Sequence, residues 1–168
     1  MAVKSNGKKG SCSVPASELT AEEMCACGKM CAHKKNHEKA MEWFLFAADK
    51  GHAEAYYQIG MMYEEGTGVA KDRKTALKWI RLAAEYGYTE AQYLLGAAYF
   101  YGKGVQTDHL DAMRWLLLGA EKGHANSQFL LGFMQLLGLG GPRKEQEAYN
   151  WLRLAANHGN TEAKKYFD

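Results

Sequence analysis

Apolar and polar residues alternate with a helical period in short segments of this chain. In the segment 53–65, the apolar residues follow the i, i+4, i+7, i+8 spacing of one buried helical face: Ala55, Ile59, Met62 and Tyr63. A Gly-Thr-Gly sequence at 66–68 follows directly. Glycine readily adopts the positive φ that ends a helix, so the pattern predicts one helix with an abrupt end.

A second helix of similar length is predicted after this turn. It starts near Asp72, which is a good N-cap residue, and runs to about Tyr86, with Gly87 placed to end it. Because the connections are short, the two helices must run antiparallel. The structural unit is therefore a helix pair.

This unit recurs along the chain every 36 residues. All the tryptophans keep the period, at Trp43, Trp79, Trp115 and Trp151. Glycines and alanines recur in the same register, for example at Gly51, Gly87, Gly123 and Gly159. A period of this length is typical of solenoids, in which each unit buries its apolar face against its neighbours. We therefore expect an all-α protein, an α/α solenoid of antiparallel helix pairs.

The period divides the chain into one elongated domain, residues 17–168, after a flexible tail at residues 1–16. The expected parts are a degenerate first pair at about 18–50, repeats at about 53–88, 89–124 and 125–160, and a stub helix at 161–168. Thr20 and Glu23 form the pattern of a capping box for the first helix. Asn36 stands one period before Asp72 and is expected to cap the second helix.

Composition agrees with a folded domain and narrows the classes of partner. The chain of 168 residues is 47% hydrophobic and 24% charged, which is enough apolar material for a core. Its net charge of +2 is too balanced to indicate a nucleic acid or an anionic membrane as partner. The N-terminus has no apolar signal region, and no later segment has the length of a membrane span. We expect a soluble, cytoplasmic protein.

The repeated unit resembles the Sel1-like repeat, a relative of the tetratricopeptide repeat. The resemblance rests on the run Ala-Glu-Ala-Tyr-Tyr-Gln-Ile-Gly-Met-Met-Tyr at 53–63, followed by Gly66, Gly68, Val69, Asp72, Ala76, Trp79, Ala83, Ala84 and Gly87. It extends from about residue 37 to the C-terminus, but the last unit departs from it at Gln135, Gly141, Pro142 and Lys144. It implies a right-handed superhelix that binds other proteins as a scaffold or adaptor, without catalysis and without a cofactor.

A candidate partner-binding face lies on the first helix of each repeat. Template positions 58, 61 and 65 share this face by their i, i+3, i+7 spacing. With the neighbouring Phe100, the residues are Gln58, Met61, Glu65, Leu94, Ala97, Tyr101, Leu130, Phe133 and Leu137. The face turns apolar toward the C-terminus. If first helices line the concave surface, as in tetratricopeptide-like solenoids, it forms a groove for a partner helix or peptide. The alternative is that these side chains belong to the core.

The cysteines indicate a competing function. Five soft or borderline metal ligands lie within thirteen residues, at Cys25, Cys27, Cys31, His33 and His37. Zinc prefers such a mixture, but the spacing differs from paired Cys-x2-Cys motifs. Cys27 also stands one period before Tyr63, a position of the helix template. We expect buried, reduced thiols and no bound metal, with a zinc- or thiol-dependent regulatory protein as the alternative function.

No catalytic motif accompanies the repeats. The Gly-Lys-Gly sequence at 102–104 lacks the ending of a phosphate-binding loop and is one of three equivalent turns. The chain has no His-Glu-x-x-His or Gly-x-Ser-x-Gly sequence. We predict a protein that binds another protein or a peptide. It could act as a scaffold or adaptor, or as an inhibitor or immunity-type protein that blocks an effector. Because the stub at 161–168 is short, self-association through the solenoid ends is also open.

Overall fold

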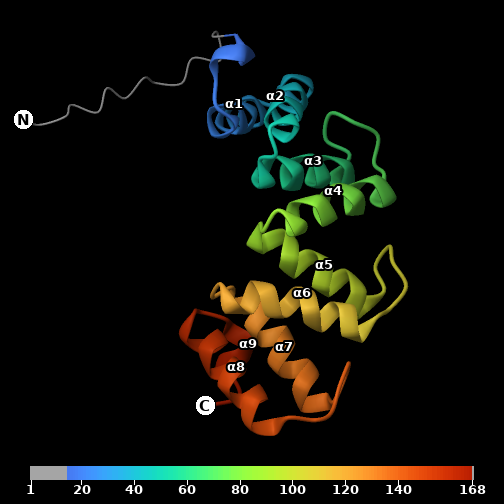
Figure 1. Ribbon diagram of the computed structural model, residues 1–168, viewed down its shortest axis with the longest axis vertical. Helices are drawn as coiled ribbons and strands as arrows, with labels where there is room; N and C mark the ends of the chain where they lie inside the picture. The colour runs from blue at the N-terminus through green and yellow to red at the C-terminus, as the bar shows by residue number, and fades with distance from the viewer. Residues whose placement is uncertain (1–14, 168) are drawn as a thin grey trace, which may run out of the picture.

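The computed structural model describes residues 15–167, and all regular structure within that range is helical (Figure 1). A short 3-10 helix, Ala16–Glu18, precedes the first α-helix. The α-helices are α1 (Ala21–His33), α2 (His37–Asp49), α3 (Ala53–Glu65), α4 (Arg73–Glu85), α5 (Thr89–Tyr101), α6 (His109–Glu121), α7 (Ala125–Leu137), α8 (Glu145–Asn157) and α9 (Thr161–Lys164). The prediction of an all-α solenoid is confirmed.

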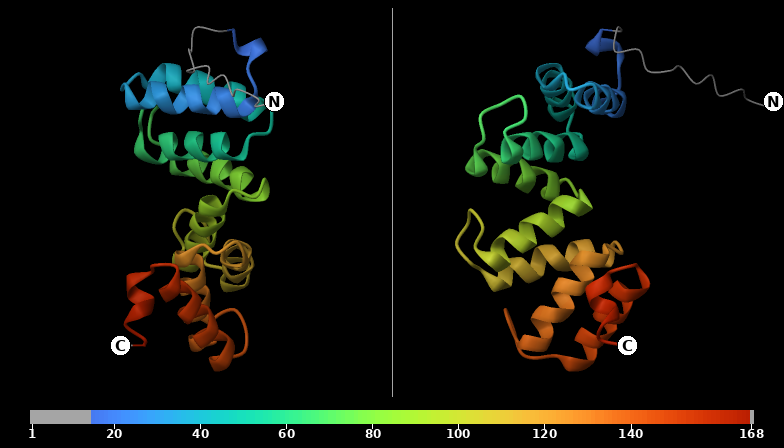
Figure 2. Two further views of the ribbon diagram at one scale, coloured as in Figure 1. Left: turned by 90° about the vertical axis from the view of Figure 1, so that its left-hand side faces the viewer. Right: turned by 180° about the vertical axis from the view of Figure 1, so that it is seen from behind.

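The helix pairs stack along the long axis of the molecule. Each helix packs against the next one in the chain, and α5 also contacts α7, so the first helices of these two repeats meet directly. The pair α1 and α2 lies at one end of the stack, and α8 and α9 lie at the other (Figure 1). The turns at 66–72, 102–108 and 138–144 lie on one side of the stack, on the right in Figure 1 and on the left when the molecule is seen from behind (Figure 2, right).

Side-chain caps fix where several of the helices begin. The Thr20 hydroxyl accepts a hydrogen bond from the Glu23 backbone N–H at 3.2 Å, and the Glu23 carboxylate accepts one from the Thr20 N–H at 2.9 Å. Asn36, Asp72 and Asp108 cap α2, α4 and α6 in a similar way, each accepting backbone N–H groups. These caps satisfy donors that would otherwise lack a partner at the helix start.

The second glycine of each turn is needed for two reasons. Gly68 has a φ of +74° and Gly104 a φ of +79°, a backbone conformation that side chains disfavour. Each also lies against the preceding repeat. A Cβ at Gly68 would stand 2.7 Å from the Cβ of His37, and one at Gly104 would stand 2.6 Å from Leu77 Cδ1. These turns therefore join neighbouring repeats as well as the helices within one repeat.

Small residues let the two helices of a repeat approach closely. The alanines at 40, 76, 112 and 148 have no exposed surface. Gly96 on α5 leaves no room for a side chain, since a Cβ there would stand 2.7 Å from Leu116 Cγ on α6. The tryptophans differ among themselves: Trp43 is buried, whereas the other three are half-buried. Close backbone packing, more than aromatic volume, thus builds the repeat.

The last repeat keeps its backbone turn although its side chains depart from the template. The Lys144 N–H donates to the Gln135 carbonyl at 3.2 Å, as the Asp72 N–H donates to Tyr63 at 3.0 Å. The Lys144 side chain, however, forms no cap on α8. The main chain of the turn is therefore conserved between repeats, and only the side-chain cap is missing.

Both ends of the chain differ in detail from the expected boundaries. Residues 1–14 of the predicted tail lie outside the described residues, and Ala16 already belongs to the 3-10 helix. The predicted stub helix is shorter than expected, because α9 covers only Thr161–Lys164. The backbone N–H groups of Tyr166 and Phe167 then form turn hydrogen bonds to the carbonyls of Ala163 and Lys164. Across residues 15–167, none of the helices has the length and apolar character needed to cross a membrane.

Candidate binding grooves and a cysteine, histidine and glutamate cluster

A groove of about 420 Å³ opens between α3, α4 and α5. We call it the α3–α5 groove. Four of the predicted partner-binding residues line it: Met61, Leu94, Ala97 and Tyr101. Leu77 and Ile80 of α4 extend its apolar lining. Tyr101 is 59% exposed, so a large aromatic side chain borders the groove without being covered by the fold.

Charged side chains from the turns and helix ends surround this apolar lining. Arg73 Nη2 lies 2.9 Å from Glu64 Oε1, and Arg73 Nε lies 3.2 Å from the same oxygen. Lys103 Nζ stands 5.1 Å from the centre of the Tyr101 ring, at the distance of a cation–π contact. The sequence did not predict Arg73 or Lys103 as site residues, because they lie outside the first helices and reach the groove only through the packing of the turns.

A second hollow of about 320 Å³ lies beside the groove, between α1, α2 and α3. The predicted residues Gln58, Met61 and Glu65 line it together with His37, Phe44 and Tyr57. Met61 lines both hollows, so they adjoin at this side chain. The Met61 side chain therefore lies where the two hollows of the N-terminal half of the solenoid meet.

The C-terminal part of the predicted face is largely closed. Leu130 is only 5% exposed and belongs to the core between α6 and α7, so its prediction as a surface anchor is wrong. Phe100 and Phe133 are half-buried against the same core cluster. The direct packing of α7 on both α5 and α6 explains this closure. Leu137, at the end of α7, stays 56% exposed.

The predicted metal ligands do not converge. Cys25, Cys27 and Cys31 are buried in the core, as the sequence predicted for these thiols. They lie on one helix, where residues two apart point in different directions. His33 is exposed at the end of α1, and His37 lines the second hollow. Within residues 15–167, these five residues place no three ligand atoms within 4.8 Å of one another, and a different trio does so.

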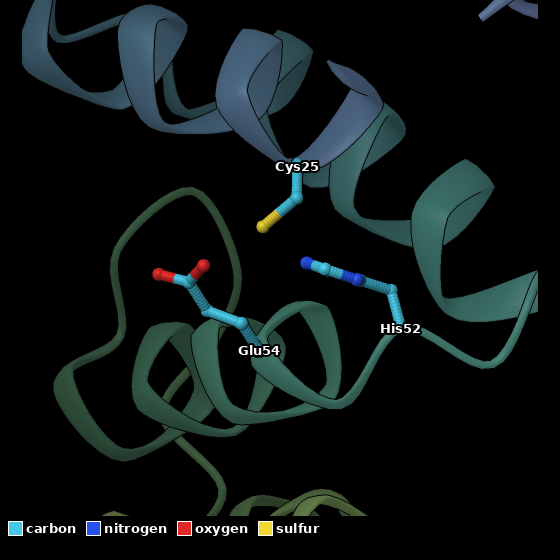
Figure 3. Close-up of side chains that lie close together, drawn as sticks. All are labelled: Cys25, His52 and Glu54. Atoms are coloured by element: carbon cyan, nitrogen blue, oxygen red, sulfur yellow. The ribbon is translucent and has the colours of Figure 1, made fainter. Parts of the chain in front are cut away.

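That trio consists of Cys25, His52 and Glu54, whose ligand atoms all lie within 4.8 Å of one another. Figure 3 shows the three side chains facing a common space. Cys25 comes from α1, His52 is the N-cap residue of α3, and Glu54 lies in the first turn of α3. Sequence reasoning missed His52 and Glu54 because they lie at the start of α3 and approach Cys25 only when α3 packs beside the first helix pair.

The electrostatics of the trio are set by burial and by one lysine. Lys29 Nζ lies 2.9 Å and 3.0 Å from the two carboxylate oxygens of Glu54. Burial raises the pKa of the Cys25 thiol from 9.0 to about 12, and the negative charge of Glu54 adds to this effect while Lys29 opposes it. His52 Nε2 is buried and has no hydrogen-bond partner. The trio thus contains a protonated thiol and an unsatisfied ring nitrogen.

Two solved structures are similar to this chain over most of its length. A Sel1 repeat protein from Oxalobacter formigenes is 33% identical, with a TM-score of 0.86, over 90% of this chain and 46% of its own. The protective antigen c5321 of uropathogenic Escherichia coli, described as having an SLR fold, is 32% identical, with a TM-score of 0.79, over 88% of this chain and 32% of its own. This chain therefore spans about half of the first protein and a third of the second.

The fold is shared more widely. Helicobacter pylori cysteine rich protein B is 18% identical, with a TM-score of 0.58, over 77% of this chain and 96% of its own, and shows the fold alone. The comparison with curated proteins finds no significant match. The family model of the Sel1 repeat matches residues 19–52, 53–88, 89–124 and 125–160. These matches cover the helix pairs from α1 to α8, and the chain therefore belongs to the Sel1 repeat family.

Proposed function

We propose that this protein is a non-catalytic scaffold that binds a segment of a partner protein in the α3–α5 groove. Sel1 repeat proteins generally serve as protein–protein interaction scaffolds. The observation that carries the proposal is the combination of an apolar lining with uncovered aromatic surface at Tyr101. Aromatic side chains beside a hollow supply much of the binding free energy in protein interfaces.

The lining defines the kind of segment that fits. Met61, Leu94 and Ala97 present only apolar side chains to the groove, which suits the apolar face of an amphipathic helix or two large apolar anchors of a peptide. At the rim, Glu64 already neutralises Arg73. Among the described residues no carboxylate forms an ion pair with Lys103, so its ammonium group is available to an acidic residue of the partner.

The proposal is tested by comparing partner capture between matched surface variants. The full chain is immobilised, proteins retained by the wild type are identified, and the leading candidate is purified and titrated by calorimetry. Ala97→Glu places a charge in the groove, and Tyr101→Ala removes the exposed ring. We expect either change to weaken binding by at least about tenfold, the range expected when an interface anchor is removed.

Tyr149→Ala is the matched control, because Tyr149 is also an exposed tyrosine but lies on α8, away from the groove. It is expected to leave binding unchanged. Circular dichroism of each variant verifies that the helices remain folded. Equal affinity of the wild type, Ala97→Glu and Tyr101→Ala for every retained protein would show that the groove is not the binding surface.

A further inference from the structure

We propose that Cys25, His52 and Glu54 form a zinc-binding site that joins the first repeat to the second. The three residues supply a sulfur, a nitrogen and an oxygen ligand from two different repeats. They face one common space between α1 and the start of α3 (Figure 3). This site differs from the cluster predicted from the sequence, with which it shares only Cys25.

The chemistry of the ligands favours zinc. Zinc is bound in proteins by thiolate, imidazole and carboxylate groups, whereas calcium and magnesium take oxygen ligands only. A tetrahedral zinc ion with bonds of about 2.0–2.3 Å separates its ligand atoms by roughly 3.3–3.6 Å. The ligand atoms here lie within 4.8 Å of one another, so rotations of the side chains are sufficient to close the site. Three protein ligands leave the fourth position to water.

The unsatisfied nitrogen of His52 is an independent sign that a ligand is missing. His52 Nε2 is buried without a hydrogen-bond partner. His124, two periods later at the same template position, has partners for both ring nitrogens: Ser127 Oγ at 2.9 Å and Glu90 Oε2 at 2.9 Å. Buried polar atoms nearly always find a partner, and a metal ion would supply one to His52.

The charges around the trio are compatible with a divalent cation. On binding, the Cys25 thiol releases its proton to solvent, and the resulting thiolate and the Glu54 carboxylate together balance the two positive charges of zinc. Glu54 has two carboxylate oxygens, so one can bind the metal while the other keeps its hydrogen bond to Lys29. Lys29 then orients the carboxylate, as partners of metal ligands commonly do.

The position of the site gives zinc a structural consequence. Cys25 lies in the first helix pair, and the other two ligands lie at the start of the second pair. Neighbouring repeats of a solenoid are held together only by their shared interface. A metal that binds the folded state through residues from both sides stabilises that state, by an amount that grows with the logarithm of its affinity, so zinc would strengthen this junction.

The test uses the full chain, stripped of metal with a chelator under reducing conditions. Zinc is titrated in competition with a chromophoric chelator, and cobalt(II) serves as a spectroscopic probe because a thiolate ligand produces a charge-transfer band in the near ultraviolet. Two variants remove ligands: Cys25→Ser, and His52→Tyr, which installs the residue found at the equivalent position 88. The matched controls are Cys27→Ser, a buried cysteine on the same helix, and His124→Tyr.

We expect the wild type and both controls to bind one zinc ion per chain, to show the thiolate band with cobalt, and to melt at a higher temperature with zinc than without it. His52→Tyr and Cys25→Ser should bind zinc on the order of 100-fold more weakly and lose the zinc-dependent rise in melting temperature. Circular dichroism of the metal-free proteins verifies folding, and His52→Tyr decides the matter where Cys25→Ser does not fold.

Several results would overturn the proposal. These are a folded wild-type chain that binds no stoichiometric zinc, a cobalt complex without a thiolate band, wild-type affinity in His52→Tyr, and equal losses in Cys25→Ser and Cys27→Ser. The last result would place the metal on cysteines of α1, which belong to the alternative ligand set of the sequence analysis: Cys25, Cys27, Cys31, His33 and His37.

Discussion

The imidazole of His124, the N-cap residue of α7, joins this helix to α5, because its Nε2 lies 2.9 Å from Oε2 of Glu90, 34 residues earlier in the chain. Its Nδ1 accepts a hydrogen bond from the Ser127 backbone N–H at 3.2 Å and so caps α7. With Nδ1 as the acceptor, the neutral ring carries its hydrogen on Nε2 and donates it to the carboxylate. Asn160 and Asn126, one period later, repeat the link at 2.9 Å.

Variants of His124 separate these two roles. His124→Ala removes both the cap and the contact with Glu90, and we expect it to lower the free energy of unfolding by about 1–2 kcal/mol. His124→Asn keeps a capping oxygen but is too short to reach Glu90, so its loss should be smaller by about half. Urea denaturation followed by circular dichroism measures both. Equal losses in the two variants would mean that the cap contributes nothing.

Gly96 is predicted to resist the substitution that helix propensity favours. Alanine at this position gains about 1 kcal/mol of propensity but inserts a methyl group into a tight contact, which typically costs about 1–3 kcal/mol. That methyl would stand 2.7 Å from Leu116 Cγ and 3.2 Å from the Ala112 carbonyl oxygen. We expect Gly96→Ala to lower the free energy of unfolding by about 1 kcal/mol overall.

The double variant Gly96→Ala with Leu116→Ala gives the control. Leu116 has no exposed surface, so its truncation alone should cost about 2–5 kcal/mol. If the added methyl clashes with this leucine, the double variant should be more stable than the sum of the single changes indicates, by at least about 1 kcal/mol. Additive changes, or a stabilised Gly96→Ala protein, would contradict the steric explanation.

The features that could be predicted from the sequence are those that the repeat itself determines. Helix pairs, turn glycines and the caps at Asn36 and Asp72 follow from local chemistry that recurs every 36 residues, and the Thr20 cap follows from its own Thr-x-x-Glu pattern. The N-terminal part of the predicted binding face lines two hollows in the structure. Its residues lie on the sides of α3 and α5 that the neighbouring helices leave uncovered. These inferences needed only the helical period.

The periodic pattern could not predict the contacts that side chains make between neighbouring helix pairs. Leu130 continues the pattern of Leu94 yet is buried, because α7 packs on both α5 and α6. Arg73 and Lys103 reach the groove from a helix start and a turn. Cys25 meets His52 and Glu54 only because the start of α3 packs beside α1 of the atypical first repeat. Each outcome depends on the packing of side chains across a boundary, which spacing along one helix does not specify.

The N-cap of α4 should make stability depend on pH. The hydroxyl of Thr75 donates to Asp72 Oδ2 at 2.7 Å, and this hydrogen bond is the largest cause that lowers the pKa of the Asp72 carboxyl below its ordinary value of 3.8. Backbone N–H groups and the charge of Lys78 act in the same direction. A lowered pKa in the folded state means that the ionised form stabilises the protein.

This stabilisation is present above pH 3.8 and is lost as the pH falls through the folded-state pKa. Asp72→Asn keeps an oxygen for the backbone donors but does not titrate. We expect the wild type to have the higher urea midpoint near neutral pH, and the difference to shrink as the pH falls below 3.8. A difference that stays constant across this range would show that ionisation of Asp72 does not contribute.

The second helix of the last repeat, α8, lacks the side-chain N-cap that α4 and α6 have, and a substitution can introduce one. Lys144 occupies the N-cap position of α8 without a side-chain cap, and Glu147 lies three residues later. Lys144→Ser would create the Ser-x-x-Glu pattern of a capping box, like that of Thr20 and Glu23. We expect this change to raise the free energy of unfolding by about 0.5–1 kcal/mol, measured by urea denaturation.

The substitution also removes an ion pair, because Lys144 Nζ lies 3.0 Å from Glu147 Oε1. Both side chains are about half exposed, and such surface pairs contribute between about 0 and 1 kcal/mol. Lys144→Ala removes the same pair without adding a cap, so the difference between the serine and alanine variants measures the cap alone. A serine variant no more stable than the alanine variant would mean that the start of α8 is held by tertiary packing, with Ala148 and Leu152 fully buried beneath it, and not by the satisfaction of its first N–H groups.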